Sequence, residues 1–170
     1  MISAEELKRR ITQLAREVSR DYRGRNPVVF GTLKGGFIFL AQLVTQLDFD
    51  LEIEFISARS YGDSEQSSGT VDLFKNISID IKDRHLLIVE DVIDSGLTLK
   101  WLLEDLEKAG PRSLEVIALL DKKSERKIEV PLRYVGFEID DRFVIGFGMD
   151  HAEKYRNLPY IAVFKDLNSN

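Results

Sequence analysis

The sequence predicts an α/β fold in which helices flank a mainly parallel, twisted sheet. Three observations lead to this prediction. Apolar, strand-like segments alternate with helical patterns along most of the chain. The segment Leu86–Val89 is continuously apolar, as expected for a strand that is covered on both faces. Parallel strands need a crossover connection, which a helix usually provides, so the alternation favours parallel pairing.

The individual elements can be placed in order along the chain. Ser3 and Glu6 have the spacing of a capping box, and apolar residues then recur at helical spacing. Later apolar segments are read as strands where they are short, and as helices where the helical spacing continues. The expected helices cover residues 4–20, 37–44 and 97–109, and the expected strands cover 28–30, 51–58, 86–89 and 114–120.

Two segments depart from this alternation. Residues 60–70 contain almost no apolar side chains, which predicts a flexible loop. Near the C-terminus, short strands at 134–139, 143–145 and 160–163, with one brief helix, predict a small subdomain beside the main sheet. We expect one domain over residues 1–170, with its core at about 20–125 and a hood formed by the N-terminal helix and a C-terminal segment from about 130 to 170.

Composition and charge limit the class of protein. The chain has 24 basic and 29 acidic residues and a net charge of −5, so nucleic acid and membrane surfaces are not expected partners. Cysteine is absent, which excludes disulfides and thiolate chemistry and fits a reducing compartment. The segment Met1–Glu6 has no basic flank or long apolar run, so a cytoplasmic location is expected.

The stretch LIVEDVIDSGLT at residues 87–98 is the strongest candidate site. A buried strand leads into Glu90 and Asp91, and then into a short loop, Asp94–Thr98, that opens a helix. Open α/β sheets bind ligands at this edge, and the loop offers backbone amides, hydroxyls and the positive end of a helix dipole to a phosphate monoester. Carboxylates accept hydrogen bonds from sugar hydroxyls and can face hydrated Mg²⁺, so a ribose 5-phosphate is predicted. From residue types alone, a helix cap beside a solvated acidic pair is an equal alternative.

The order of residues in this stretch closely resembles the ribose-diphosphate-binding motif of type I phosphoribosyltransferases. That motif has an apolar strand, two acids, two apolar residues and then Asp-Ser/Thr-Gly-x-Thr. The resemblance covers nearly the whole chain and points to the bacterial type of the hypoxanthine-guanine branch. Its further motifs are LKGG at 33–36, SYG at 60–62, LLDK at 119–122, VGFEI at 135–139 and DHAEKYRNLPYI from 150.

The resemblance implies the type I phosphoribosyltransferase fold and an activity in purine salvage. Atom N9 of a 6-oxopurine would displace pyrophosphate from C1 of 5-phosphoribosyl 1-diphosphate, with Mg²⁺ as cofactor. The implied ligands are hypoxanthine, guanine, IMP, GMP and pyrophosphate, and the implied assembly is a homodimer or homotetramer. The sugar would become partly cationic in the transition state, and two adjacent carboxylates would stabilise that charge. The flexible loop would be a lid that excludes water.

The resemblance also assigns roles to individual residues. Asp94 would transfer the proton of the purine imidazole ring, and Lys122 would donate to the 6-oxo group and so discriminate against adenine. It further implies a cis peptide bond between Leu33 and Lys34. The assigned residues are Glu90, Asp91, Asp94, Ser95, Gly96, Leu97 and Thr98 for ribose and phosphate, Lys34, Gly35 and Arg156 for pyrophosphate, Lys122, Phe143 and Val144 for the purine, Glu90, Asp91 and Asp150 for the metal, and Ser60 and Tyr61 for the lid.

Other interpretations compete with this one. A sister enzyme for xanthine, adenine or orotate would keep residues 87–98 and differ around Lys122 and Phe143, which favour a 6-oxopurine. A nucleotide-sensing, RNA-binding regulator of the same fold would usually display a basic face, which the net charge of −5 does not support. We read Lys123, Arg126 and Lys127 as a solvated basic run, and without the resemblance Lys122 would be read in the same way. A purely structural domain would need none of these motifs.

Overall fold

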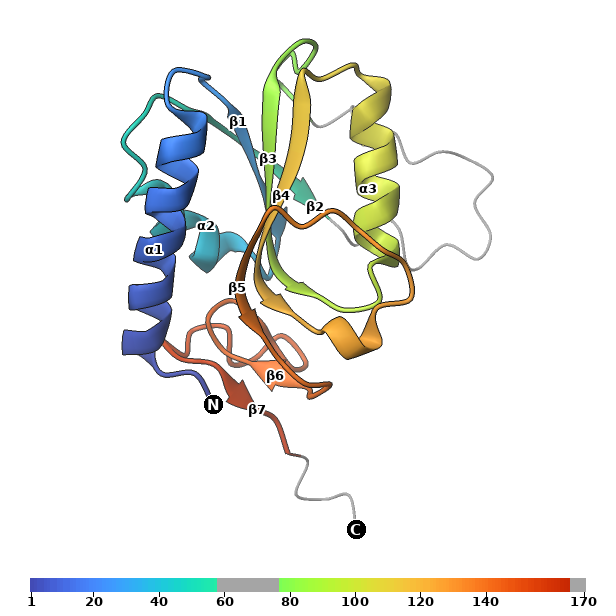
Figure 1. Cartoon of the computed structure of the whole chain (residues 1–170). Helices are drawn as coiled ribbons and strands as arrows, with labels where there is room; N and C mark the ends of the chain where they lie inside the picture. Colours follow the sequence, from blue (N-terminus) through green and yellow to red (C-terminus); the bar gives the residue numbers. More distant parts are fainter. Residues whose placement is uncertain (58–76, 166–170) are drawn as a thin grey trace.

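The computed structural model describes residues 1–57 and 77–165. Its main sheet contains five parallel strands in the order β2-β1-β3-β4-β5 (Figure 1). The predicted fold class is therefore confirmed. The strands are β1 (Val28–Leu33), β2 (Glu52–Ser57), β3 (His85–Ile93), β4 (Ser113–Asp121) and β5 (Tyr134–Glu138). The predicted loop at residues 60–70 lies outside the described residues.

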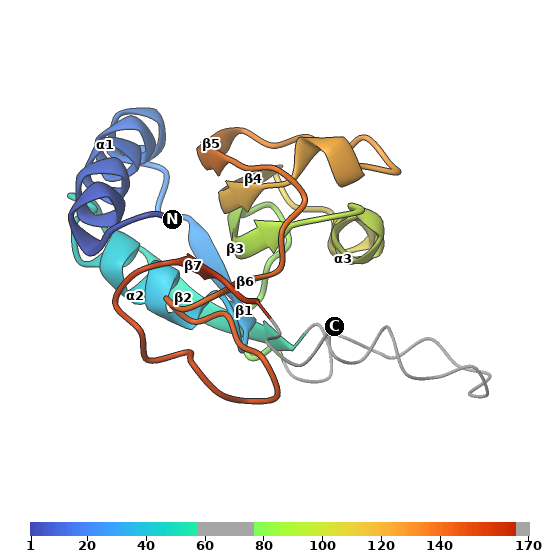
Figure 2. The same cartoon turned by 90° about the horizontal axis from the view of Figure 1, so that it is seen from below.

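Three α-helices cover the two faces of this sheet. They are α1 (Ala4–Tyr22), α2 (Phe37–Val44) and α3 (Leu97–Lys108). Figures 1 and 2 show α1 and α2 on one face and α3 on the other, and each face has its own cluster of buried apolar side chains. None of the helices in the described part of the chain combines the length and apolarity needed to cross a membrane.

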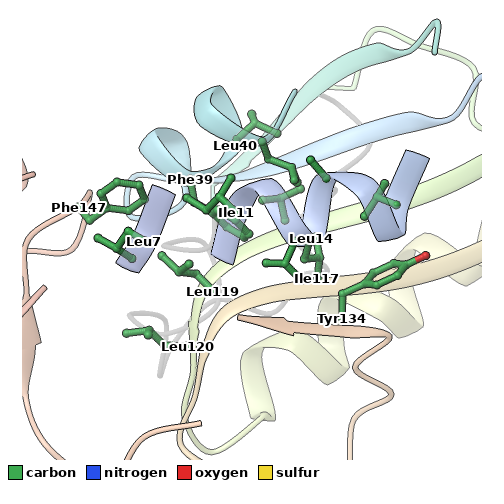
Figure 3. Close-up of a cluster of buried hydrophobic side chains, with 14 of the residues drawn as sticks. Leu7, Ile11, Leu14, Phe39, Leu40, Ile117, Leu119, Leu120, Tyr134 and Phe147 are labelled. Atoms are coloured by element: carbon green, nitrogen blue, oxygen red, sulfur yellow. The ribbon is translucent and has the colours of Figure 1, made fainter. Parts of the chain in front are cut away.

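Helix α1 has the N-terminal cap and the apolar face that the sequence predicts. The Ser3 hydroxyl accepts from the Glu6 amide at 3.3 Å, and the Glu6 carboxylate accepts from the Ser3 amide at 2.8 Å, so the predicted capping box is confirmed. The helix ends at Tyr22, two residues beyond the expected end. Its apolar face packs on the sheet, where Figure 3 shows Leu7 and Ile11 beside β4 residues of the same cluster.

The C-terminal part of the main sheet differs from the prediction. Residues 134–139 were expected in a separate subdomain, but β5 pairs in parallel with β4, with Leu120 opposite Phe137. That prediction is wrong because the chain reaches β5 without a crossover α-helix. The connection contains only the 3₁₀ turn η3 (Lys123–Glu125). Within the described residues that follow β5, turns replace the brief helix that was expected.

A second, smaller sheet lies below the main one in Figure 1. Strands β6 (Val144–Ile145) and β7 (Ala162–Val163) pair antiparallel. The N-terminus reaches this region, since the amides of Ile2 and Ile161 each donate to the other residue's carbonyl at 3.0 Å. The division of the chain into a core and a hood remains a prediction.

Candidate active site

The site lies at the carboxyl edge of the parallel sheet, where open α/β sheets bind ligands. A cavity of about 220 Å³ opens there and is lined by the end of β3, the loop that follows and the first turn of α3. Strand β3 runs to Ile93, so Glu90 and Asp91 belong to the strand itself. The lining residues are 90–96, 98 and 99, which include nearly all of the predicted ribose and phosphate residues.

The loop before α3 is held in place by the segment that follows η3. The amides of Lys127 and Ile128 donate to the Ser95 carbonyl at 3.0 and 3.2 Å. Gly96 has a φ of 82°, and a Cβ there would approach the Ile128 carbonyl to 2.8 Å, so glycine is required for both reasons. Gly96 is also the N-cap of α3 and makes no side-chain cap, although the Ser95 hydroxyl accepts from the Leu97 amide at 3.4 Å. Of the two residues that the alternative assigns to helix capping, Ser95 makes this contact, whereas the Asp94 carboxylate is directed to Lys122.

Of the two acidic side chains of β3, Glu90 is buried and Asp91 is half-buried, so the pair is not fully solvated. Burial and the neighbouring Asp91 raise the pKa of the Glu90 carboxyl to about 8, although Thr32 donates a hydrogen bond to it at 2.7 Å. Burial also raises the pKa of the Asp91 carboxyl, while backbone hydrogen bonds and Arg156 act in the opposite direction. Negative charge in this position is costly until a cation or several hydroxyl donors arrive. The pair is therefore suited to a sugar that becomes cationic.

The glycine loop after β1 packs tightly against this acidic pair. The peptide bond between Leu33 and Lys34 is cis, as the resemblance implied. A Cβ on Gly35 would overlap the Asp91 carboxylate, and a Cβ on Gly148 would overlap the Gly35 carbonyl. Three segments that are distant in sequence thus meet here: the backbones at Gly35 and Gly148 lie against each other, and β3 contributes the Asp91 side chain.

The residues predicted for pyrophosphate meet at one place, although they are far apart in the sequence. The Arg156 guanidinium contacts Asp150 at 2.8 Å and Glu153 at 3.1 Å, and it donates to the Gly148 carbonyl at 2.9 Å. Lys34 reaches the same Glu153 carboxylate at 3.2 Å. Glu153 was not predicted, because a lone acid in a turn carries no signal in a single sequence.

Among the residues predicted for the purine, Lys122 lies close to the segment that carries Phe143 and Val144. Lys122 is buried, and its Nζ lies 3.4 Å from a carboxylate oxygen of Asp94 and 3.4 Å from one of Asp141. Asp141 was missed by the sequence analysis. Phe143 is exposed and packs edge-on with His151 and Phe164, with ring centroids 5.5 and 6.0 Å apart, while Val144 is buried.

The basic run after β4 is only partly solvated. Lys123 is 76% exposed, as expected. The prediction is wrong for Arg126, whose side chain is 11% exposed and pairs with Asp121. The residues predicted for the lid, Ser60 and Tyr61, lie outside the described residues.

The carboxylates give limited support for a metal that is bound by protein alone. In residues 1–57 and 77–165, no three His, Cys, Asp or Glu side chains lie close enough to hold an ion. Asp150 uses one oxygen to pair with Arg156 and the other to accept from the Glu153 amide at 2.8 Å. Glu90, Asp91 and Asp150 therefore fit a hydrated ion that arrives with a phosphorylated ligand, because Mg²⁺ commonly keeps several waters and takes one or two carboxylates.

Comparisons with known proteins agree with this geometry. The phosphoribosyl transferase domain matches residues 3–152. The hypoxanthine-guanine phosphoribosyltransferase of Bacillus subtilis (strain 168) is 43% identical over 165 residues, which cover 97% of this chain and 92% of that protein. The hypoxanthine phosphoribosyltransferase of Escherichia coli (strain K12) is 42% identical over 163 residues, covering 95% and 92%. A crystal structure of a hypoxanthine-guanine phosphoribosyltransferase from Bacillus anthracis superimposes with a TM-score of 0.88 at 44% identity, covering 97% of each chain. Since the matched domain spans most of the chain and nearly all of the site, this chain belongs to the phosphoribosyl transferase family.

Proposed function

We propose that this protein is a purine-salvage enzyme that joins hypoxanthine, and also guanine, to the ribose 5-phosphate unit of 5-phosphoribosyl 1-diphosphate. The products are IMP or GMP and pyrophosphate. The observation that carries the proposal is the pairing of Lys122 with Asp94 at the end of the phosphate loop, 3.4 Å apart. In a 6-oxopurine, O6 and N7 are neighbours on one edge of the base. A lysine donor beside a carboxylate matches that edge.

The phosphate loop and the acidic pair hold the sugar. The amides of residues 95–98 and the hydroxyls of Ser95 and Thr98 bind the 5′-phosphate, while Glu90 and Asp91 accept from the ribose hydroxyls. As the bond to pyrophosphate breaks, positive charge develops on the sugar ring. The ionised form of these buried carboxyls then becomes favourable, which stabilises the transition state more than the ground state.

The base is oriented and deprotonated by its own set of groups. Phe143 stacks on the ring, the Val144 backbone meets its edge, and Lys122 donates to O6. Asp94 accepts the imidazole proton as N9 attacks C1. Adenine presents an amino group to Lys122, so donor would face donor and adenine is rejected.

The departing pyrophosphate is bound by Lys34, the Gly35 backbone and Arg156. We propose Mg²⁺ as the cofactor, with Glu90, Asp91 and Asp150 facing its water shell. When bound, the ion neutralises charge on the diphosphate. We also propose that Ser60 and Tyr61 belong to a lid over the site. The protein is further proposed to assemble as a homodimer or homotetramer.

The test incubates the purified protein with phosphoribosyl diphosphate, MgCl₂ and one base at a time, and separates the products by chromatography. We expect IMP from hypoxanthine and GMP from guanine, with no AMP from adenine. Lys122→Ala is expected to lose at least about tenfold in kcat/KM, since a buried donor to the base disappears. Lys123→Ala is the matched control and is expected to keep full activity, because its neighbouring ammonium is exposed. Tight binding of phosphoribosyl diphosphate without nucleotide formation from any base would favour a regulatory protein instead.

A further inference from the structure

A buried ion pair closes the turn between the base lysine and the phosphate loop. Asp121 is the last residue of β4, and Arg126 follows the 3₁₀ turn η3. The guanidinium donates to the Asp121 carboxylate, and the two side chains are only 11% and 9% exposed. Neither residue is among those assigned to the ligand.

On one side, Arg126 lies against the phosphate loop. Its Cδ is 3.1 Å from the position that a Cβ on Gly96 would occupy. The next two amides, those of Lys127 and Ile128, donate to the Ser95 carbonyl. Residues 126–128 therefore form a wall that fixes the loop from outside.

On the other side, Asp121 is directly joined to the purine lysine. Asp121 is in register with Ile93 at the end of β3, and the Lys122 amide donates to the Ile93 carbonyl at 2.9 Å. The ion pair thus connects the strand end that carries Lys122 with the wall that holds the phosphate loop.

We propose that Asp121 and Arg126 are a positioning pair that sets the spacing between the phosphate loop and Lys122. The inference rests on the proposed function, in which one nucleotide is gripped at both of these places. A buried ion pair is weak evidence for stability, because desolvation offsets the attraction between its members. A planar guanidinium held by a carboxylate does, however, fix geometry, and a misplacement of about 1 Å in such a site can cost about 100-fold in rate.

The test compares ligands that contact one end of the site with a ligand that contacts both. Asp121→Leu/Arg126→Met removes both charges and keeps apolar bulk, so that no charge is left buried alone. We expect the Kd of IMP, measured by calorimetry, to rise about tenfold, since both ends must fit at once. The Kd of ribose 5-phosphate, which contacts the phosphate loop and the acidic pair but does not reach Lys122, is expected to change less than about threefold, and the melting temperature to stay near that of the parent.

The matched control is Glu52→Leu/Arg84→Met, which removes another ion pair at the opposite edge of the sheet. It is expected to leave both dissociation constants unchanged. Arg126→Lys keeps the positive charge and most of the aliphatic part of the side chain. It is the second test variant, to be used if the double variant does not fold. Without the planar guanidinium, it is expected to weaken IMP about threefold with little effect on ribose 5-phosphate.

Equal weakening of IMP and ribose 5-phosphate would overturn the inference, because the pair would then support the loop and not the spacing. Unchanged IMP binding in a folded variant would overturn it as well. A parent protein that binds no IMP would instead count against the proposed function, so the two failures can be told apart.

Discussion

Lys122 stands between two carboxylates that are alike in distance and exposure. Each lies 3.4 Å from its Nζ, and their side chains are 57% exposed for Asp94 and 58% for Asp141. They differ in location, because Asp94 belongs to the phosphate loop and Asp141 follows β5. Substitution of Asp141 can therefore serve as a control for the proton transfer that is proposed for Asp94.

Asp94→Asn removes the proposed base and keeps the shape of the side chain. We expect kcat for IMP formation to fall by about 100-fold or more, as is usual when a general base is lost. Asp141→Asn removes an equivalent contact to Lys122, and kcat is expected to change by less than about fivefold. Steady-state kinetics with hypoxanthine measures both. Equal losses in the two variants would show that contact with Lys122, and not proton transfer, is what matters.

The buried carboxyl of Glu90 links stability to pH. Its pKa is raised from 4.5 to about 8, chiefly by burial, so the folded state binds more protons than the unfolded state between these values. The free energy of unfolding therefore falls as pH rises from about 4.5 to about 8, by up to about 1.4 kcal/mol per pH unit.

Glu90→Gln is expected to flatten this slope, which urea unfolding at pH 5, 6, 7 and 8 measures. Glu104→Gln, at an exposed position on α3, is the control and should follow the parent. If Glu90→Gln and the parent lose stability in parallel over this range, the burial of Glu90 is not the cause.

At the scale of elements, the glycine loop after β1 depends on a close approach to β3. Gly35→Ala would place a methyl group on the Asp91 carboxylate. We expect a rise of about tenfold or more in KM for phosphoribosyl diphosphate, since the loop that receives pyrophosphate must move. A loss of about 1–3 kcal/mol in stability should accompany it, as in other overpacked sites.

Gly110→Ala is the control for this substitution. Gly110 lies between α3 and β4, away from the site, and has open space around its Cα but a φ of 71°. A loss of about 1 kcal/mol with unchanged KM is expected there. Unaltered kinetics in Gly35→Ala would mean that the loop tolerates displacement and does not depend on this contact.

The elements that the sequence predicted well are those with strong local signals. The capping box of α1, the apolar run of β3 and the small residues before α3 each specify local structure, and the structure agrees with them. Strand β5 was misplaced because its connection lacks the helix that parallel strands usually require. Arg126 and Asp141 were missed because their partners, Asp121 and Lys122, meet them only after the chain has folded back.

At the scale of the whole molecule, Ile2 near the N-terminus pairs with a segment of the C-terminal region that also carries predicted site residues. Ile161 is fully buried and pairs with Ile2, and the same C-terminal segment carries Arg156 and Asp150. Ile161→Ala is expected to lower the free energy of unfolding by about 2–4 kcal/mol, as for other truncations of buried aliphatic side chains. It should also raise KM for phosphoribosyl diphosphate, because Arg156 is anchored through this segment.

Leu106→Ala provides the comparison for that substitution. Leu106 is fully buried in the cluster under α3, on the other face of the sheet. A similar loss of stability with an unchanged KM is expected, and urea unfolding with steady-state kinetics tests both variants. Identical kinetic effects in the two variants would show that global stability alone controls the site.

The missing crossover helix between β4 and β5 has a consequence for how base preference can change. Lys122 and the wall at residues 126–128 belong to a connection, and neither is part of a helix or strand that the main sheet needs for its own pairing. Altering Lys122 at the start of this short return would change which heterocycle is accepted, while the wall at residues 126–128 continues to hold the phosphate loop. One scaffold can therefore serve several bases by exchanging residues around Lys122 and Phe143, which both lie outside the strands of the main sheet.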